Sequence, residues 1–459
     1  MHQKHMGHVT KFPTKTTVYD PQKSWNGYTL FMAPDVGAML IDMEGNEVHT
    51  WKKLIGFPCK MLPGGYVMGS TWERNKNCGF QDMGDLVEMD WNGNILWKFD
   101  NLEKATGSDD KKGFMARQHH DYERQGNPCG YFSPEHEALA HSGTTLILCH
   151  EDAIVPEISK YPLLDDKIIE VSWEGNILWQ WNAREHFHEF GFTEAMKKSI
   201  YDHPNILPTL QKGDWLHINS ASWLGENPWY DQGDLRFHPE NIIIDSKEAG
   251  FIAIISKETG HIVWRIGPDF SKNIVFDPLM HGQPEESIRA IQNIGPIIGQ
   301  HHAHMIPRGL PGNGNILVFD NGGWGGYGVP SLTAPDGHNV LKRDYSRVLE
   351  INPITFLVEW QYSAAEAGFL PPFENFRFYS PLVSSVQRLP NGNTLICEGV
   401  DGRIFEVTPK HELVWEYINP YIKHTANSTF MLPGTNMVYR AYRIPYKWVP
   451  DKFRVCCSK

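Results

Sequence analysis

The chain has 459 residues, more than one hydrophobic core normally serves, and its formal net charge is −12. This negative balance, without any stripe of Lys and Arg, excludes a general nucleic-acid partner. No apolar run approaches the roughly 18 residues of a membrane span, so no membrane partner is expected.

The N-terminal segment lacks the apolar stretch of a secretory signal. Its first thirty residues contain His, Lys and Thr instead. The seven cysteines are odd in number and form no C-x-x-C pair, a pattern typical of reduced thiols rather than of a disulfide framework. We therefore expect a cytoplasmic protein.

A short phrase that ends in tryptophan recurs six times along the chain. Each copy places turn residues before an apolar strand that finishes on the aromatic side chain. The copies are Asp42–Trp51, Asp90–Trp97, Ser172–Trp179, Ser256–Trp264, Asn352–Trp360 and Thr408–Trp415. The pattern predicts six copies of one hairpin.

A second phrase, in which turn residues lead into a β-branched run, precedes most of these hairpins. It occurs at Met61–Met68, Gly143–Leu148, Gly312–Phe319, Leu389–Ile396 and Met431–Val438. Together the two phrases give about four strands per unit, which is the content of a propeller blade. The predicted fold is all-β: a six-bladed β-propeller with long loop insertions, forming a single domain over residues 1–459.

The order of the phrases predicts how the ring closes. The N-terminal segment Tyr28–Trp51 carries only the second half of a blade, and the last segment, His424–Tyr442, carries only the first half. We therefore expect a closing blade shared by the N- and C-terminal segments, between residues near 25–52 and 424–443. An N-terminal extension over 1–24 and a C-terminal tail over 444–459 remain. Helix is expected only in insertions such as Thr193–Ile200.

Histidines gather where several blades begin their first strand. The motifs are Gln118-His-His-Asp121, Leu216-His-Ile-Asn-Ser220, Gln300-His-His-Ala-His304 and Lys423-His-Thr-Ala-Asn427. Matching places on innermost strands converge on the propeller axis, so His120, His217, His302 and His424 are candidates for one shared site. Convergent imidazoles can bind a transition metal, or act as nucleophile, acid and base around a charged substrate. Alternation along a strand leaves open whether His119 or His120, and His301 or His302, faces the axis.

Loops near the same strand ends supply further candidate substrate-binding residues. Asp320 and Asn321 precede the Gly-rich loop Gly322–Gly328, whose backbone can approach a ligand closely and whose Trp324 is expected to stack on an aromatic substrate. The predicted substrate-binding set is His120, Asn219, Asp320, Asn321, Trp324 and Tyr379.

Two other polar segments lie between strands. Arg403, in the last complete blade, would suit a sulfate, phosphate or carboxylate if it reaches the axis. The segment Cys149–Asp152 follows an apolar strand and could place a carboxylate near the axis, but a solvated strand end is the favoured interpretation.

With these residues in place, the chain resembles the bacterial arylsulfotransferase family, six-bladed propellers that transfer sulfuryl groups between phenols through a sulfated histidine. The resemblance spans nearly the whole chain. It rests on Tyr19-Asp-Pro-Gln22, Asn26-Gly-Tyr-Thr-Leu-Phe31, Asp214-Trp-Leu-His-Ile-Asn-Ser220, His302 leading to Phe319-Asp-Asn-Gly322, Tyr345-Ser-Arg-Val-Leu-Glu350 and Tyr379-Ser-Pro381.

The resemblance implies that two active-site imidazoles fall on His217 and His302. The chain departs from the family at two other places. Gly323-Trp324 follows the Phe-Asp-Asn-Gly segment without the family's sulfate-binding arginine, and Arg403 stands near the position of the nucleophilic histidine. The implied catalytic set is His217, His302, His424 and Arg403, with His424 as a possible replacement nucleophile.

Four functions remain open at this point. Sulfuryl transfer on an aromatic or anionic small molecule leads and requires no cofactor. A lyase or hydrolase that binds a transition metal through His120, His217, His302 and His424 is the first alternative. A metal-free hydrolase or lyase and a non-catalytic binding propeller follow, since a fold alone does not fix a function.

Overall fold

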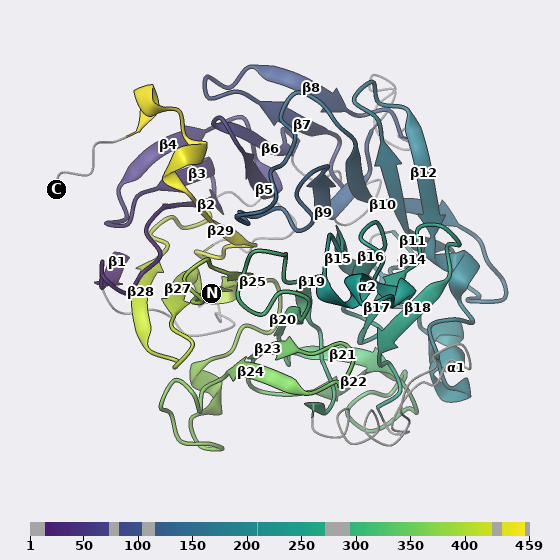
Figure 1. The fold of residues 1–459 in the computed structure, drawn as a ribbon. Coiled ribbons are helices and arrows are strands. Elements are labelled where there is room, and N and C mark those ends of the chain that lie inside the picture. The colour runs from purple at the N-terminus through teal and green to yellow at the C-terminus, as the bar shows by residue number, and fades with distance from the viewer. Residues whose placement is uncertain are drawn as a thin grey trace.

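Six sheets, each built on four antiparallel strands, stand around a common axis in the computed structural model of the chain (Figure 1). The structure describes residues 14–72, 82–102, 115–208, 210–270, 294–424 and 434–454. The prediction of an all-β six-bladed propeller is confirmed. In every blade the first strand lies nearest the axis and the fourth lies at the rim (Figure 1).

The blades are numbered from the one that closes the ring, with strands in order from axis to rim. Blade 1 contains β29 (Ala441–Ile444), β2 (Tyr28–Ala33), β3 (Gly37–Ile41) and β4 (Glu47–Trp51). Blade 2 contains β5 (Gly56–Leu62), β6 (Tyr66–Ser70), β7 (Leu86–Met89) and β8 (Ile95–Phe99). Blade 3 contains β9 (Gln118–Arg124), β10 (Thr145–Ala153), β11 (Leu163–Val171) and β12 (Ile177–Asn182).

The other three blades follow the same order. Blade 4 contains β15 (Ile218–Trp223), β16 (Ile242–Ser246), β17 (Phe251–Ile255) and β18 (Ile262–Ile266). Blade 5 contains β19 (His301–Met305), β20 (Ile316–Asp320), β23 (Arg347–Ile351) and β24 (Val358–Tyr362). Blade 6 contains β25 (Ser385–Arg388), β26 (Thr394–Glu398), β27 (Arg403–Val407) and β28 (Leu413–Ile418).

Blade 1 closes the ring as predicted, from both ends of the chain. The strand β29 pairs with β2, with Ala441 opposite Phe31 and Ile444 opposite Tyr28. Three of its strands come from the N-terminal segment and one from the C-terminal segment, rather than two from each. The closure joins distant segments by main-chain hydrogen bonds, so neither end can leave the ring without breaking a sheet.

The six tryptophans of the repeated phrase explain why the phrase recurs. Each lies on the fourth strand of its blade, and its indole Nε1 donates a hydrogen bond to a backbone carbonyl of the next blade. The bonds are Trp51 to Asp90 (2.9 Å), Trp97 to Trp173 (2.8 Å), Trp179 to Lys257 (3.0 Å), Trp264 to Pro353 (2.9 Å), Trp360 to Pro409 (3.1 Å) and Trp415 to Met43 (2.8 Å). The last bond leads from blade 6 back to blade 1, so one type of contact goes once around the ring.

Insertions add elements outside the blades. Blade 3 is extended by β13 (Ile206–Leu207) and β14 (Lys212–Gly213), and β1 (Lys15–Tyr19) pairs with β28 as a fifth strand of blade 6. The helices α1 (Glu194–Asp202) and α2 (Pro228–Asp231) both lie in insertions, as predicted, and Thr193 caps α1 by accepting from the Met196 backbone N. Short 3-10 turns span Ala183–His186, Leu235–Phe237, Asn375–Arg377, Gly399–Asp401, Tyr446–Trp448 and Asp451–Phe453.

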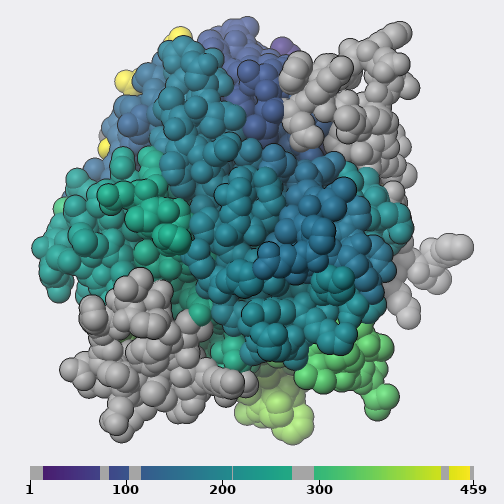
Figure 2. All heavy atoms as spheres, turned by 90° about the vertical axis from the view of Figure 1, so that its right-hand side faces the viewer, coloured from purple at the N-terminus to yellow at the C-terminus, as the bar shows by residue number. Residues whose placement is uncertain are grey.

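A hairpin between β20 and β23 lies at the end of the propeller where the innermost strands begin. It consists of β21 (Trp324–Tyr327) and β22 (His338–Lys342). Figure 2 shows the outer wall on the side of α1 and β12, formed mostly by the blue to teal residues of blades 3 and 4 and their insertions. Among the described residues, no helix is long and apolar enough to cross a membrane.

Candidate active site on the propeller axis

His120, His217 and His302 occupy the same place in three neighbouring blades. His120 lies in β9, His217 directly precedes β15, and His302 lies in β19. All three have left-handed backbones, with φ of 55°, 50° and 58°. Such a conformation costs a non-glycine residue about 1–3 kcal/mol, and it clusters at functional sites. The strand pairing shifts register beside each of them, and a bulge of this kind re-aims a side chain.

Two of these imidazoles are in contact. The ring centroids of His120 and His217 lie 4.7 Å apart, at an interplanar angle of 69°. His217 is 8% exposed, whereas His120 and His302 are each 2% exposed. His217 is therefore the imidazole of this group that a small molecule can reach most readily.

A buried arginine of the closing blade joins the three histidine-bearing blades. Arg440 directly precedes β29, and its Nη1 forms a 3.0 Å ion pair with Asp121 Oδ2 of β9. Its Nη2 donates to the backbone carbonyl of Asn219 in β15 at 2.6 Å. Burial lowers the pKa of His302 well below its usual range, and the charge of Arg440 lowers it further. Arg440 is thus a cation at the meeting point of blades 1, 3, 4 and 5.

Lys60 of β5 adds a second buried cation to this group. Its Nζ donates to Asp121 Oδ1 and to Glu123 Oε1, each at 2.7 Å. Burial tends to raise the pKa of Asp121, but Arg440 and Lys60 together hold it below its usual range. Burial raises the pKa of Glu123, Lys60 opposes this shift, and the charge of Asp121 adds to it. The two cations Arg440 and Lys60 therefore face the carboxyl groups of Asp121 and Glu123.

His217 is oriented by a carboxylate. Its Nδ1 donates to Asp214 Oδ2 at 2.5 Å, which leaves the lone pair on Nε2. A carboxylate behind an imidazole fixes the tautomer and stabilises positive charge that develops on the ring. His217 is therefore prepared to act as a base or a nucleophile.

The imidazole of His302 presents the opposite tautomer. Its Nδ1 accepts a hydrogen bond from the Val386 backbone N at 3.3 Å, so the hydrogen of the neutral ring is on Nε2. His304 supports the same segment, because its Nδ1 donates to the His302 carbonyl at 2.9 Å. Burial lowers the pKa of His304 to about 4. His302 can therefore donate a hydrogen bond where His217 offers a lone pair.

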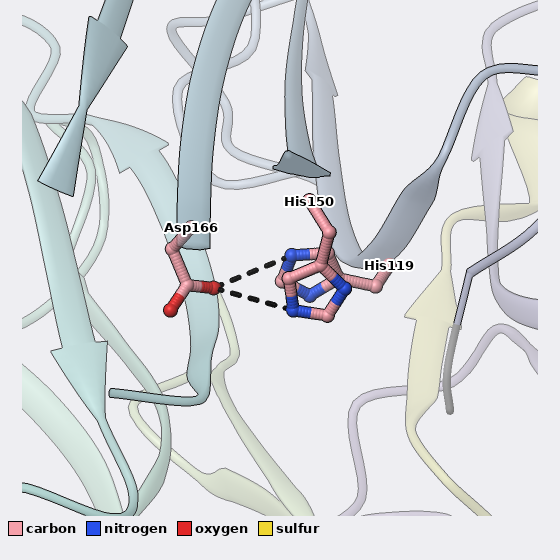
Figure 3. Close-up of side chains that lie close together, drawn as sticks. All are labelled: His119, His150 and Asp166. Carbon is pink, nitrogen blue, oxygen red and sulfur yellow. Dashed lines mark ion pairs between the residues drawn. The ribbon is translucent and has the colours of Figure 1, made fainter. Parts of the chain in front are cut away.

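A second group of side chains, His119, His150 and Asp166, lies inside blade 3 (Figure 3). His119 Nε2 and His150 Nε2 lie 3.3 Å and 3.7 Å from the same atom, Asp166 Oδ1. The two imidazole rings are stacked, with centroids 3.6 Å apart. The strand end Glu151–Ala153 is partly exposed, in line with the sequence-based interpretation, whereas His150 and the other two side chains are fully buried. The reason for this burial is that β10 is a central strand, flanked by β9 and β11.

Two predicted catalytic residues lie away from the axial group. Arg403 begins β27, the third strand of its blade, rather than an innermost strand. Its guanidinium pairs with Glu398 Oε2 at 3.1 Å and with Glu416 Oε2 at 2.6 Å, which neutralises its charge. His424 is exposed, and its backbone N donates to Asp35 Oδ2 at 2.7 Å. The structure therefore brings neither residue to the axial histidines.

Asp320 and Asn321 are buried links between elements. Asp320 Oδ2 pairs with Arg343 at 2.8 Å and with Arg347 at 2.6 Å. Asn321 Oδ1 accepts from His301 Nδ1 at 2.8 Å, and burial lowers the pKa of His301 to about 3. Both residues position their neighbours, and Asn321 is the one that holds an imidazole.

Trp324 and Tyr379 line a cavity of about 700 Å³ at the same end of the propeller. The lining residues are Gly323, Trp324, Asn339, Lys342, Arg343, Asp344 and Tyr379. Lys247 Nζ lies 5.2 Å from the centroid of the Trp324 ring. Burial would raise the pKa of Glu248, but Lys247 and His338 hold it well below its usual range. Aromatic rings beside two cationic side chains suit an aromatic anion.

The fold and these contacts define a six-bladed propeller with an imidazole and arginine group at one end of its axis. The sequence model of the family Arylsulfotransferase (ASST) matches residues 73–440, so the chain belongs to this family. No curated protein matches the sequence.

Several solved structures match the chain at low similarity. A protein of unknown function from Bacteroides caccae is 11% identical, with a TM-score of 0.41, over 92% of this chain and 99% of that chain. Dihydro-heme d1 dehydrogenase NirN is 11% identical, with a TM-score of 0.36, over 97% and 80%. The β-propeller domain of Cps50 (Swd1) from Myceliophteria thermophila is 9% identical, with a TM-score of 0.36, over 91% and 90%. Likeness at this level says nothing about function.

Sequence reasoning missed Arg440, Asp214 and Asp166. Asp214 lies three residues before His217, in a segment that carried the family resemblance, and this spacing was the available signal. Arg440 precedes the strand that closes the ring, so its axial place follows once β29 is recognised as an innermost strand. Asp166 could not be found from spacing, because only the pairing of β10 with β11 sets Asp166 opposite His150.

Proposed function

We propose that the protein transfers a sulfuryl group from an aryl sulfate to a phenol at the axial site. The observation that carries this proposal is the pair of His217 and Asp214, in which a carboxylate 2.5 Å from Nδ1 leaves Nε2 as the attacking atom. Membership of the Arylsulfotransferase family supports the same reaction class. The reaction requires no cofactor.

In the proposed first step, the lone pair of His217 Nε2 forms a bond to sulfur, and the bond between sulfur and the aryl oxygen breaks. The phenolate leaves with the electron pair of that bond. Asp214 stabilises the positive charge that this creates on the imidazole. In the second step the acceptor phenol gives its proton to solvent and its oxygen attacks sulfur. The bond from sulfur to Nε2 then breaks, and its electron pair returns to His217.

Charge on the substrate determines the roles of the neighbouring residues. A sulfate ester brings a negative charge into a chain of net charge −12, so the site must be locally cationic. Arg440 supplies this cation in place of Arg403, and Lys60 helps by neutralising Asp121. The Nε2–H of His302 is available to stabilise the phenolate oxygen as it forms.

The metal-dependent lyase or hydrolase expected from four axial imidazoles has weaker support. It requires His424, which is exposed and bound to Asp35 through its backbone. A purely structural or binding propeller gives no reason for three left-handed histidines around a buried arginine.

The test is an assay of the purified chain with p-nitrophenyl sulfate, with and without an added phenol. We expect p-nitrophenol release that depends on the acceptor, together with a sulfated acceptor in the products. Release at the rate of the buffer alone, across a panel of phenols, would contradict the proposal.

A further inference from the structure

We infer that His119, His150 and Asp166 bind a divalent transition metal ion inside blade 3. The nearest nitrogen and oxygen atoms of the three residues all lie within 4.8 Å of one another. Four atoms that surround one ion with bonds of roughly 2.0–2.2 Å are separated by about 3–4 Å. The separations of 3.3 Å and 3.7 Å from Asp166 Oδ1 to the two imidazole nitrogens already fit this geometry.

The ligand atoms lack well-formed hydrogen bonds within the described part of the chain. His119 Nε2, His150 Nε2 and Asp166 Oδ1 are all buried, and none makes a well-formed hydrogen bond with a described residue. An unsatisfied buried polar atom destabilises the folded chain. Asp214 Oδ1 lies 4.0 Å from His150 Nε2, beside this group. A single cation between His119, His150 and Asp166 would satisfy the ligand atoms of all three.

Contacts on the far side of each imidazole direct its Nε2 toward the same point. His150 Nδ1 donates to Asp82 Oδ1 at 2.6 Å, and Asp82 Oδ2 accepts from Arg117 Nε at 2.7 Å. His119 Nδ1 lies 2.8 Å from His120 Nδ1. Metal-binding histidines usually have such a partner on the second nitrogen, which fixes the tautomer and the ring orientation.

Another histidine and carboxylate group of the chain provides a contrast. His186, Glu189 and His261 also lie close enough to share an ion. There, however, Glu189 Oε1 already accepts from His186 Nδ1 at 3.0 Å and from His261 Nδ1 at 2.9 Å, and His261 is exposed. That group is satisfied by its own hydrogen bonds, whereas the buried group is not.

The ligand set and its burial indicate which metal binds and what it does. Two imidazoles with a carboxylate suit Zn²⁺, Mn²⁺ or Fe²⁺ better than Ca²⁺ or Mg²⁺. The three ligands are fully buried, so the ion is out of reach of a substrate and its role is to position side chains. It would hold His120 through His119. This inference does not depend on sulfuryl transfer.

The first test measures metal in protein purified without a metal-affinity tag, after growth with added Zn²⁺, Mn²⁺ and Fe²⁺. We expect about one equivalent of one of these metals, and a lower Tm after chelation, because the ion binds only the folded chain. Addition of Co²⁺ to the chelated wild-type protein should produce visible absorption bands of a bound ion. Less than about a tenth of an equivalent, with no bands on Co²⁺ addition, overturns the inference.

Variants separate the buried group from the surface group. His150→Gln and Asp166→Asn should each reduce bound metal at least tenfold. The matched control, His261→Gln, removes an imidazole from the surface group and should leave the metal content unchanged. If the control loses the metal while the blade 3 variants keep it, the ion belongs to the surface group and the inference is wrong.

Discussion

Five of the six blades contribute charged or ionisable side chains to the axial site, and they fall into two groups with different chemistry. Blades 3, 4 and 5 supply imidazoles, with His120, His217 and His302 in matching left-handed positions. Blades 1 and 2 supply the cations Arg440 and Lys60. The group with imidazoles is the one that forms and breaks bonds in the proposed reaction, and the group with cations compensates the charge of the substrate.

The comparison also explains why Arg440 and Arg403 have different partners. Arg440 directly precedes an innermost strand and faces the histidines, whereas Arg403 begins a third strand and faces Glu398 and Glu416. The place of a strand within its blade, and not the residue type, decides whether a charge reaches the axis.

The largest effect on activity should follow substitution of an axial histidine. His217→Gln removes the attacking nitrogen, and we expect kcat for sulfuryl transfer to fall by at least about 10³-fold, as for other catalytic groups that act directly on the substrate. His186→Gln makes the same substitution outside the axis and should keep nearly full activity. Equal losses in the two variants would show that His217 has no special role.

A smaller loss of activity is expected when a cation of the axial site is substituted. Arg440→Lys keeps the charge beside Asp121 but loses the planar donor to the Asn219 carbonyl. We expect kcat/KM for an aryl sulfate to fall by roughly 10–100-fold, the equivalent of one or two charge-assisted hydrogen bonds. Circular dichroism should show an intact fold. Unchanged kcat/KM in a folded Arg440→Lys protein would remove Arg440 from the site.

Arg403→Ala sharpens the contrast between the two arginines. Because Arg403 is bound to two carboxylates on the outer part of its blade, we expect kcat/KM to stay within about threefold of wild type. Thermal unfolding should instead show a lower Tm, because Glu398 loses its partner while buried. A hundredfold loss of kcat/KM with an unchanged Tm would restore Arg403 as the sulfate-binding residue.

The smallest effect concerns the pH dependence of stability on the imidazole side. Burial lowers the pKa of His304 to about 4, below the value of about 6.5 for an unfolded chain. The unfolded chain therefore binds a proton that the folded chain refuses, and the free energy of unfolding decreases as pH falls from 6.5 toward 4. His304→Gln should weaken this decrease in urea unfolding at pH 7 and pH 5. Parallel decreases in both proteins would assign the effect to other groups.

The sequence was sufficient for the architecture because each blade repeats the same local signals. Turn residues, strand patterns and a terminal tryptophan recur in every unit, and the tryptophans bind the next blade by one type of hydrogen bond. The shared closing blade followed from the order of the same phrases, although its division into three strands and one did not.

The site was harder to predict because it depends on register between segments that are far apart in sequence. His120, His217 and His302 were found from their common place at the start of innermost strands. Arg440 and Asp121 form their ion pair across more than three hundred residues, which no local pattern encodes. Arg403 was placed at the axis from a motif, but the pairing of its strand with β26 and β28 keeps it away.

The most direct test of the account is to identify the atom that carries the sulfuryl group during turnover. The wild-type chain is mixed with p-nitrophenyl sulfate in the absence of acceptor. It is then digested under conditions that preserve the bond between nitrogen and sulfur, and the peptides are analysed by mass spectrometry. The account predicts an added sulfuryl group on the peptide containing His217, which disappears when a phenol is added and is absent from His217→Gln. A sulfuryl group on His302, His120 or His424, or on no histidine in a protein that turns over, would contradict it.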